Sequence, residues 1–162
     1  MKWIIKSLLL LFPIIAVSQY DYGPKNGIGI HLTNDGHGGF GGSIRYLRQI
    51  GQGGTMKFEL KLNRHDLYNA RIGYEFLKFR KDKFELGIGV DLNYRFWDLE
   101  QFGYQNINEL YVELPIELRY HINSKYLISA GVSFGEKIQK NKFVYLPHVN
   151  KPEIRLGVGY KF

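Results

Sequence analysis

The sequence predicts an all-β fold, namely an antiparallel up-and-down barrel of eight strands. Aromatic residues and glycine are abundant, with 12 Tyr, 11 Phe and 19 Gly in 162 residues, and this composition favours strands and tight turns over helices. Almost no segment has the 3.6-residue period of a helix, whereas eight segments alternate between apolar and polar residues. Such alternation is typical of strands with two different faces.

The first four segments cover residues 28–32, 40–46, 56–62 and 70–76. In each, every second residue is apolar or glycine, and the residues between them are mostly polar, charged or glycine. Their apolar faces consist of Ile28, Ile30 and Leu32; Phe40, Gly42, Ile44 and Tyr46; Met56, Phe58, Leu60 and Leu62; and Ala70, Ile72, Tyr74 and Phe76.

The last four segments cover residues 84–96, 110–120, 126–134 and 154–162 and keep the same alternation. No residue on the apolar face of any segment is charged, so each segment has a clear inner and outer side. Their apolar faces consist of Phe84, Leu86, Ile88, Val90, Leu92, Tyr94 and Phe96; Leu110, Val112, Leu114, Ile116, Leu118 and Tyr120; Tyr126, Ile128, Ala130, Val132 and Phe134; and Ile154, Leu156, Val158, Tyr160 and Phe162.

The opposite face of the same segments carries charges of both signs, separated by glycine, serine and asparagine. Because opposite charges in equal number can pair with one another, we expect this face to form a charge network. Its members are Arg45, Lys57, Glu59, Lys61, Arg71, Glu75, Glu85, Asp91, Arg95, Glu109, Glu113, Glu117, Arg119, Glu153, Arg155 and Lys161, eight of each sign. His31 and His121 lie on the same face.

Side-chain volume indicates which face points into the barrel. An eight-stranded barrel has an interior just wide enough for side chains to fill, and the large apolar residues would not fit there. The apolar face therefore points to lipid, where a Lys or Arg at mid-depth would cost roughly 2–4 kcal/mol. The predicted fold is a transmembrane barrel. The alternative is a secreted lipocalin-like binder, in which the same alternation places the apolar face inside.

The connections are short on one side of the predicted barrel and long on the other. Turns are expected around residues 51–54, 81–83 and 123–125, and long loops at 97–108 and 136–151. In outer-membrane barrels the short turns face the periplasm and the long loops face outward. We expect a periplasmic aromatic girdle of Tyr46, Phe76, Phe84, Tyr120, Tyr126, Tyr160 and Phe162, and an outer one starting from Phe40, Tyr94, Phe96 and Phe134.

The N-terminal residues predict export. Residues 1–18 have a basic start, a short apolar run, and small residues at Ala16 and Ser18, so we expect a signal peptide that leaves 19–162 as the barrel domain. Its removal lowers the formal charge from +7 to +5. The sequence has no cysteine, which excludes lipid anchoring through cysteine, and it has no basic cluster of the kind that binds nucleic acid.

The last segment carries a more specific pattern. Arg155, Gly157, Tyr160 and Phe162 fill the positions of an assembly signal, in which a polar residue, a glycine and two aromatic residues recur at fixed spacing. With this pattern, residues 19–162 resemble the small eight-stranded outer-membrane barrels of the OmpA-barrel, OmpX and OmpW kind. The resemblance implies a monomer in outer-membrane lipid, assembled by barrel-assembly machinery through its C-terminal strand, with both termini in the periplasm.

Two functions follow from this fold. We favour a structural or surface-interaction protein whose lumen is plugged by the charge network and whose loops 97–108 and 136–151 form a possible surface for a ligand. In such a plug we expect Glu113 and Arg119 to be a balanced pair. The alternative is a narrow porin-like channel for ions or small solutes.

A lipid-modifying enzyme is less favoured. The hydroxyl groups on the apolar face all belong to tyrosines, so no serine or threonine nucleophile faces lipid there. The five histidines lack the spacing of metal ligands. We therefore predict no catalytic residues, no metal site and no cofactor.

Overall fold

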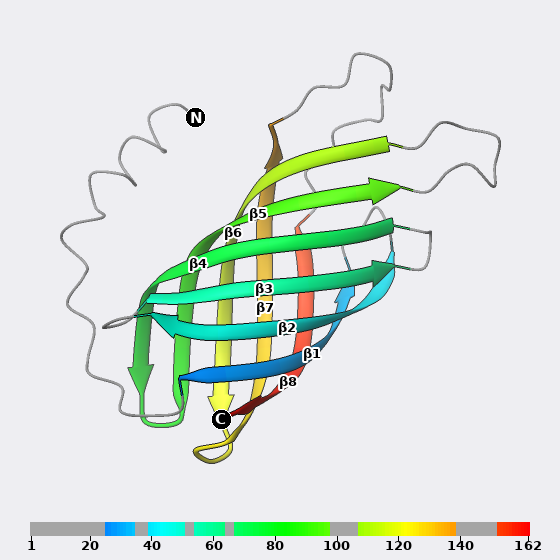
Figure 1. Ribbon diagram of the computed structural model, residues 1–162. Coiled ribbons are helices and arrows are strands. Elements are labelled where there is room, and N and C mark those ends of the chain that lie inside the picture. The colour runs from blue at the N-terminus through cyan, green and yellow to red at the C-terminus, as the bar shows by residue number, and fades with distance from the viewer. Residues whose placement is uncertain (1–24, 35–38, 51–53, 64–66, 98–106, 139–151) are drawn as a thin grey trace.

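The computed structural model describes residues 25–34, 39–50, 54–63, 67–97, 107–138 and 152–162, and the predicted signal peptide lies outside them. Eight antiparallel strands form a closed barrel in chain order, which confirms the predicted fold class (Figure 1). No helix in the described residues is long and apolar enough to cross a membrane. The strands are β1 (Asn26–Asn34), β2 (Phe40–Ile50), β3 (Gly54–Asn63), β4 (Leu67–Lys81), β5 (Phe84–Trp97), β6 (Ile107–His121), β7 (Tyr126–Lys137) and β8 (Glu153–Lys161).

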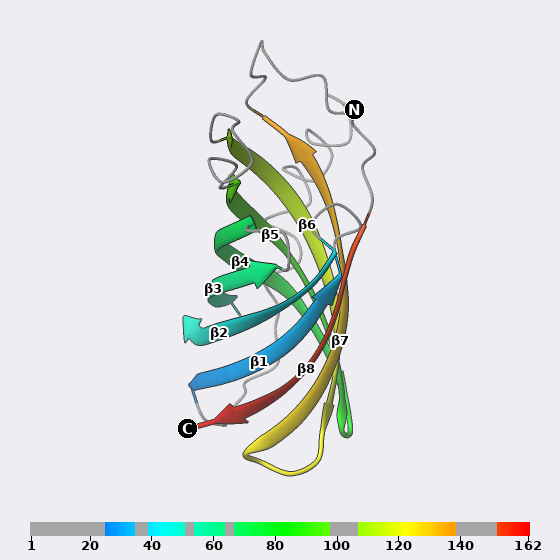
Figure 2. The ribbon, with the colours of Figure 1, turned by 90° about the vertical axis from the view of Figure 1, so that its right-hand side faces the viewer.

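The first and last strands close the barrel. Figure 2 shows β1 and β8 side by side, and their register pairs Ile28 with Tyr160 and Leu32 with Leu156. Each strand thus has a hydrogen-bonded neighbour on both sides. Closure leaves no strand edge with unpaired backbone groups, which is a requirement for a sheet inside lipid.

Large apolar side chains cover the outside of the barrel, and charged side chains fill the inside. Leu32 and Phe40 are 71% and 73% exposed, whereas Arg45 and Glu113 are 1% and 2% exposed. This arrangement is the inverse of a water-soluble protein and agrees with the volume argument. It is incompatible with the lipocalin-like alternative, because that fold requires the apolar face inside.

The barrel has two unlike ends. At one, which we name the turn end, short connections join β2 to β3, β4 to β5, and β6 to β7, and β1 begins and β8 ends there. The other, the loop end, carries the remaining four connections. In the β4–β5 turn Asp82 has a φ of 53°, a left-handed conformation that aspartate tolerates better than most residues do. The longest connections are shorter than predicted, because β5, β6 and β7 include Trp97, Ile107 and Lys137.

Aromatic rings pair on the outside of the barrel near the turn end. Phe84 lies 5.1 Å from Tyr120 between ring centroids, and Tyr160 contacts both Tyr126 and Phe162, at 5.3 and 6.2 Å. Rings at this depth are characteristic of the boundary between lipid tails and head groups. At the loop end, Tyr68 packs at 6.1 Å from Phe96, so Tyr68 joins the outer girdle that the sequence predicted without it.

Phe76, which the sequence places in this girdle, lies at an irregularity of β4. The register of β4 with β5 passes from Glu75↔Gly89 to Leu77↔Ile88, so Phe76 is the inserted residue of a β-bulge. A bulge shifts the alternation by one residue. Beyond it the outer face continues through Leu77 and Phe79, and Phe79 is 57% exposed.

Candidate functional site

The lumen of the barrel is the candidate site, because the alternation of eight strands directs their charged residues into it. Fifteen of the sixteen charged residues predicted for this face are buried there. The sixteenth, Lys161, is half-buried and lines a recess at the turn end. Their burial arises from strand period alone, since odd-numbered residues of neighbouring strands face the same side.

Arg71 is one centre of the network. Its guanidinium lies 3.2 Å from Glu59, 2.8 Å from Glu113 and 3.1 Å from Glu153 between nitrogen and carboxylate oxygen. Asp91 is more distant, at 3.9 Å. Only Arg offers five N–H donors in a planar fork, which is why a single residue on β4 can engage carboxylates from β3, β6 and β8.

Arg119 is the second centre and lies closer to the turn end. It pairs with Glu75 at 2.6 Å, with Glu85 at 2.7 Å and with Glu117 at 3.1 Å. Glu85 also contacts the ring nitrogen Nε2 of His121 at 3.2 Å. The expectation that Glu113 and Arg119 form a pair is therefore wrong: Glu113 pairs with Arg71, and Arg119 has other carboxylate partners.

Arg45 joins the two centres into one network. From β2 it contacts Glu59 at 3.0 Å and Glu117 at 2.5 Å. Glu59 belongs to the cluster around Arg71, and Glu117 to the cluster around Arg119. Arg155 of β8 adds a further contact to Glu59, at 3.3 Å. Some of these ion pairs join neighbouring strands, such as Arg45 with Glu59, and others cross the lumen, such as Arg45 with Glu117.

At the loop end a smaller cluster surrounds Glu109. Its carboxylate pairs with Lys137 at 2.6 Å and accepts hydrogen bonds from Tyr111 and Trp97, at 2.9 and 3.3 Å. Arg95 lies 4.2 Å above the ring of Tyr111, a cation–π contact. Lys137 and Tyr111 were not among the predicted lumenal residues, although both stand at odd-numbered positions in phase with Glu109 and Glu113.

Glycines and a histidine fill the lumen beside the closing strands. The ring of His31 lies directly over Gly157, where a Cβ atom would overlap it, and a Cβ at Gly29 would stand 3.0 Å from the same ring. His31 is 5% exposed. The glycines therefore leave the space that the imidazole occupies, and Gly157 is required by packing.

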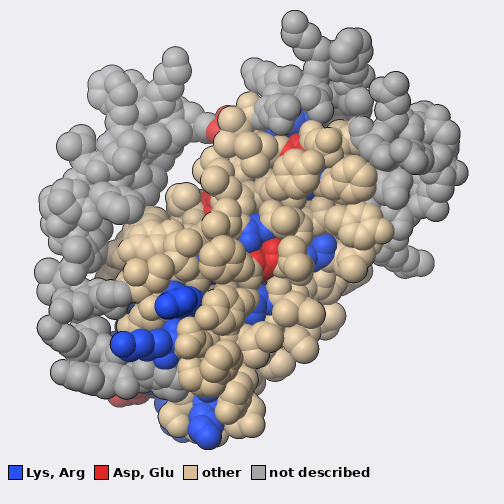
Figure 3. All heavy atoms as spheres, viewed as in Figure 1, with Lys and Arg blue, Asp and Glu red and all other residues tan. Residues whose placement is uncertain are grey.

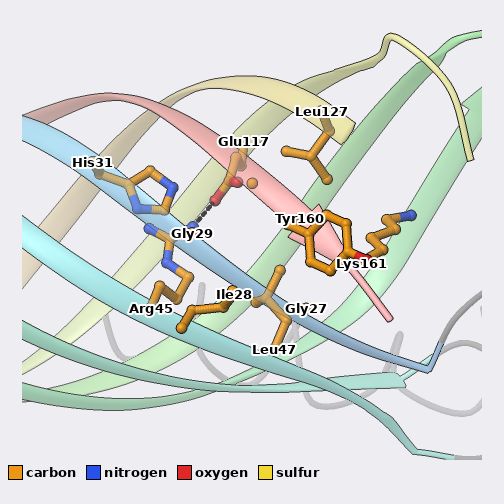
Figure 4. A pocket seen from close by; sticks show the side chains of 11 residues that line it. Gly27, Ile28, Gly29, His31, Arg45, Leu47, Glu117, Leu127, Tyr160 and Lys161 are labelled. Atoms are coloured by element: carbon orange, nitrogen blue, oxygen red, sulfur yellow. Dashed lines mark hydrogen bonds and ion pairs between the residues drawn. The ribbon is translucent and has the colours of Figure 1, made fainter. Parts of the chain in front are cut away.

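A small recess opens between β1, β2 and β8 near the turn end (Figure 4). Leu47 and Leu127 line it, together with the ion pair of Arg45 and Glu117 and the ring of His31. Its free volume is about 10 Å³, roughly the room that one water molecule needs. The recess is too small to hold a substrate or cofactor.

The described residues contain no group of three His, Cys, Asp or Glu side chains placed to hold a metal ion. The acidic residues of the lumen instead face arginine and lysine. Chemically, the site is a filled polar core whose charges neutralise one another.

Comparison with solved structures shows what this architecture is similar to. The N-terminal β-barrel domain of Pseudomonas aeruginosa OprF aligns with 86% of this chain and 99% of its own, with a TM-score of 0.65 and 9% identity. The chain has the fold of the small eight-stranded outer-membrane barrels. Neisserial surface protein A aligns with 85% of this chain and 94% of its own, with a TM-score of 0.53 and 17% identity.

A de novo designed barrel, TMB2.3, aligns with 88% of this chain and 98% of its own, with a TM-score of 0.50 and 12% identity. At these identities the similarity concerns the fold of the barrel alone. No protein-family model matches the sequence. No curated protein matches it either.

Proposed function

We propose that this chain is a structural or surface-interaction protein of the outer membrane, with a plugged lumen and two long loops at the cell surface. The observation that carries the proposal is the ion-pair network that crosses the lumen through Arg71, Arg45 and Arg119. Paired side chains occupy the cross-section that a channel would leave to water. The proposal assigns no catalytic step to the barrel.

The membrane location is supported by the outer surface. Exposed aliphatic residues such as Ile30, Leu60 and Val158 cover the middle of the strands, and aromatic pairs lie near the turn end. By analogy with barrels of this fold, the turn end and both termini face the periplasm and the loop end faces outward. We expect export through the signal peptide 1–18 and a monomer in lipid.

Conductance across a planar bilayer tests the plug. The purified chain is expected to give no steady current, because paired charged side chains occupy the lumen. A variant that opens the lumen serves as the positive control: Arg71→Gly with Glu113→Gly removes two side chains from the centre of the network. Its current would show that insertion and recording both work.

The alternative, a narrow porin-like channel, predicts a steady current in the same bilayer measurement. A stable ion-selective current through the unaltered chain, with a selectivity that changes when Arg95 or Glu113 is replaced, would overturn the plug. Arg95 and Glu113 pair at 3.1 Å, so either replacement would alter the charge at the same level of the lumen.

The surface role is tested by loss of binding. Deletion of residues 98–106 or 139–151, replaced by a short glycine-serine linker, removes a connection at the loop end without touching a described strand. Capture of a surface ligand in a pull-down is expected to disappear with one of these deletions. Binding that survives both would contradict a role for the long loops.

A further inference from the structure

Positive side chains surround the turn end of the barrel. Figure 3 shows Lys and Arg gathered in the lower left of the molecule, over the turns. We name these exposed residues the basic collar: Lys25, Arg48, Lys81, Lys83 and Lys125. Of the described acidic residues at this end, Asp82 is exposed, and Glu85 is buried in the lumen. The collar therefore has a large positive excess.

The collar lies immediately beyond the aromatic girdle. Arg48 follows Tyr46 by two residues on the outer face of β2, and Lys81 follows Phe79 in the same way on β4. Lys125 directly precedes Tyr126. Aromatic rings mark the level where lipid tails end, so the cationic groups reach the level of the head groups.

The collar is a ring and not a single patch. Its members come from the start of β1, the end of β2, the β4–β5 turn and the β6–β7 turn, which are spread around the barrel (Figures 1 and 2). A protein bound at one flank of the barrel would meet only some of these charges. A lipid leaflet surrounds the barrel and meets charges on every side.

We propose that the basic collar binds the phosphate groups of anionic phospholipids in the leaflet that surrounds the turn end. This inference rests on the proposed membrane function. Arg48 and Lys81 can lay their aliphatic stems along the apolar wall while their charged ends contact phosphate. Lys and Arg near an anionic membrane surface attract its lipids, and salt weakens this attraction.

The test compares two lipids at the surface of the inserted chain. The protein is folded into vesicles of phosphatidylcholine and phosphatidylglycerol that contain a trace of one or the other lipid with a spin label, and the label immobilised at the barrel is measured. We expect a preference for phosphatidylglycerol of roughly fivefold, equivalent to one basic side chain at a charged surface. High salt should reduce the preference.

Two variants with equal loss of charge locate the effect. The collar variant carries Arg48→Gln, Lys81→Gln, Lys83→Gln and Lys125→Gln, and the control carries Arg64→Gln, Lys140→Gln, Lys142→Gln and Lys151→Gln, in connections at the loop end. The collar variant should lose most of the preference, and the control should keep it. Heat-modifiable migration on a gel establishes that each variant is folded.

Several results would overturn the inference. Insertion without lipid preference, or a preference lost only in the control, would remove the collar as a lipid site while leaving the membrane function intact. Binding of a soluble polyanion such as heparin, without lipid preference, would assign the collar to an acidic macromolecule. Failure of the unaltered chain to insert would overturn the membrane function and the inference together.

Discussion

At the scale of single residues, buried arginines are the centres of the charge network. Arg71 and Arg119 are 5% and 2% exposed and each faces several carboxylates. Removing one member of a buried ion pair lowers the free energy of unfolding more than removing both, because the remaining charge is then buried without a partner. In such a network, the effect of replacing one charged residue on the free energy of unfolding depends on which of its partners are present.

The pair of Lys57 and Asp91 allows this to be measured. The two groups lie 2.9 Å apart. We expect Lys57→Met or Asp91→Asn alone to lower the free energy of unfolding by about 3–5 kcal/mol, and the double variant to lower it by less than the sum. Urea unfolding in lipid vesicles gives the values. Additive losses would show that the two charges do not interact.

Gly157 is a second test at this scale, because its absent side chain is what admits His31. Gly157→Ala should destabilise the barrel by about 1–3 kcal/mol through overpacking, and His31→Ser in the same chain should relieve part of the loss. Gly42→Ala is the matched control, since the nearest atom to a Cβ there is 4.0 Å away. Equal losses at Gly157 and Gly42 would contradict the packing argument.

Among the elements, β8 combines structural and assembly roles. The residues of its predicted assembly signal all have contacts within the barrel: Arg155 donates to Ser133, Gly157 makes room for His31, and Tyr160 stacks on Phe162. The pattern thus follows in part from the fold itself. Whether assembly machinery also reads it is a separate question that a comparison of folding with and without the machinery can answer.

We expect Tyr160→Ala to lower the folded yield more in the presence of barrel-assembly machinery than in unassisted folding into detergent. Loss of packing against Tyr126 should lower the folded yield with and without the machinery. Loss of recognition by the machinery should lower it only when the machinery is present. Tyr160→Phe should keep both the packing and the recognition. Phe143→Ala in the 139–151 connection is the control for the loss of any aromatic ring. An equal loss in both settings would assign Tyr160 to packing alone.

The period-two alternation predicted the strands well because each strand has one face in a polar core and the other exposed and apolar. It failed beyond Phe76, because a bulge there moves the outer face of β4 to odd-numbered positions, although the sequence Tyr-Glu-Phe-Leu continues to look regular. It also ended β7 too early. Lys137 looked like loop charge, although its partner Glu109 holds it in the lumen.

The charge network was predictable in membership but not in pairing. Membership depends on strand phase, which the sequence contains. Pairing depends on which side chains meet across the lumen: Glu59 and Arg155 are 96 residues apart and three strands apart around the barrel, yet they hydrogen-bond. Local spacing carries no information on such contacts, and for this reason the expected pair of Glu113 and Arg119 was wrong.

For the whole molecule, a closed ring of strands predicts unfolding as one unit. Each strand depends on two neighbours, so opening any seam exposes backbone groups to lipid. Fluorescence of Trp97 at the loop end and of a Trp97→Phe, Tyr126→Trp variant at the turn end should report the same urea midpoint. Two separate midpoints would show that the two ends unfold independently.

The ion pairs that cross the lumen also constrain how the barrel is made. Arg71 of β4 meets Glu153 of β8, and Arg155 of β8 meets Glu59 of β3, so these contacts exist only after the last strand has arrived. Until then many charged side chains lack their final partners, and placing them in lipid would cost a large free energy. We therefore expect the growing sheet to keep its inner face in water, so that closure, insertion and neutralisation of the charges occur as a single late event.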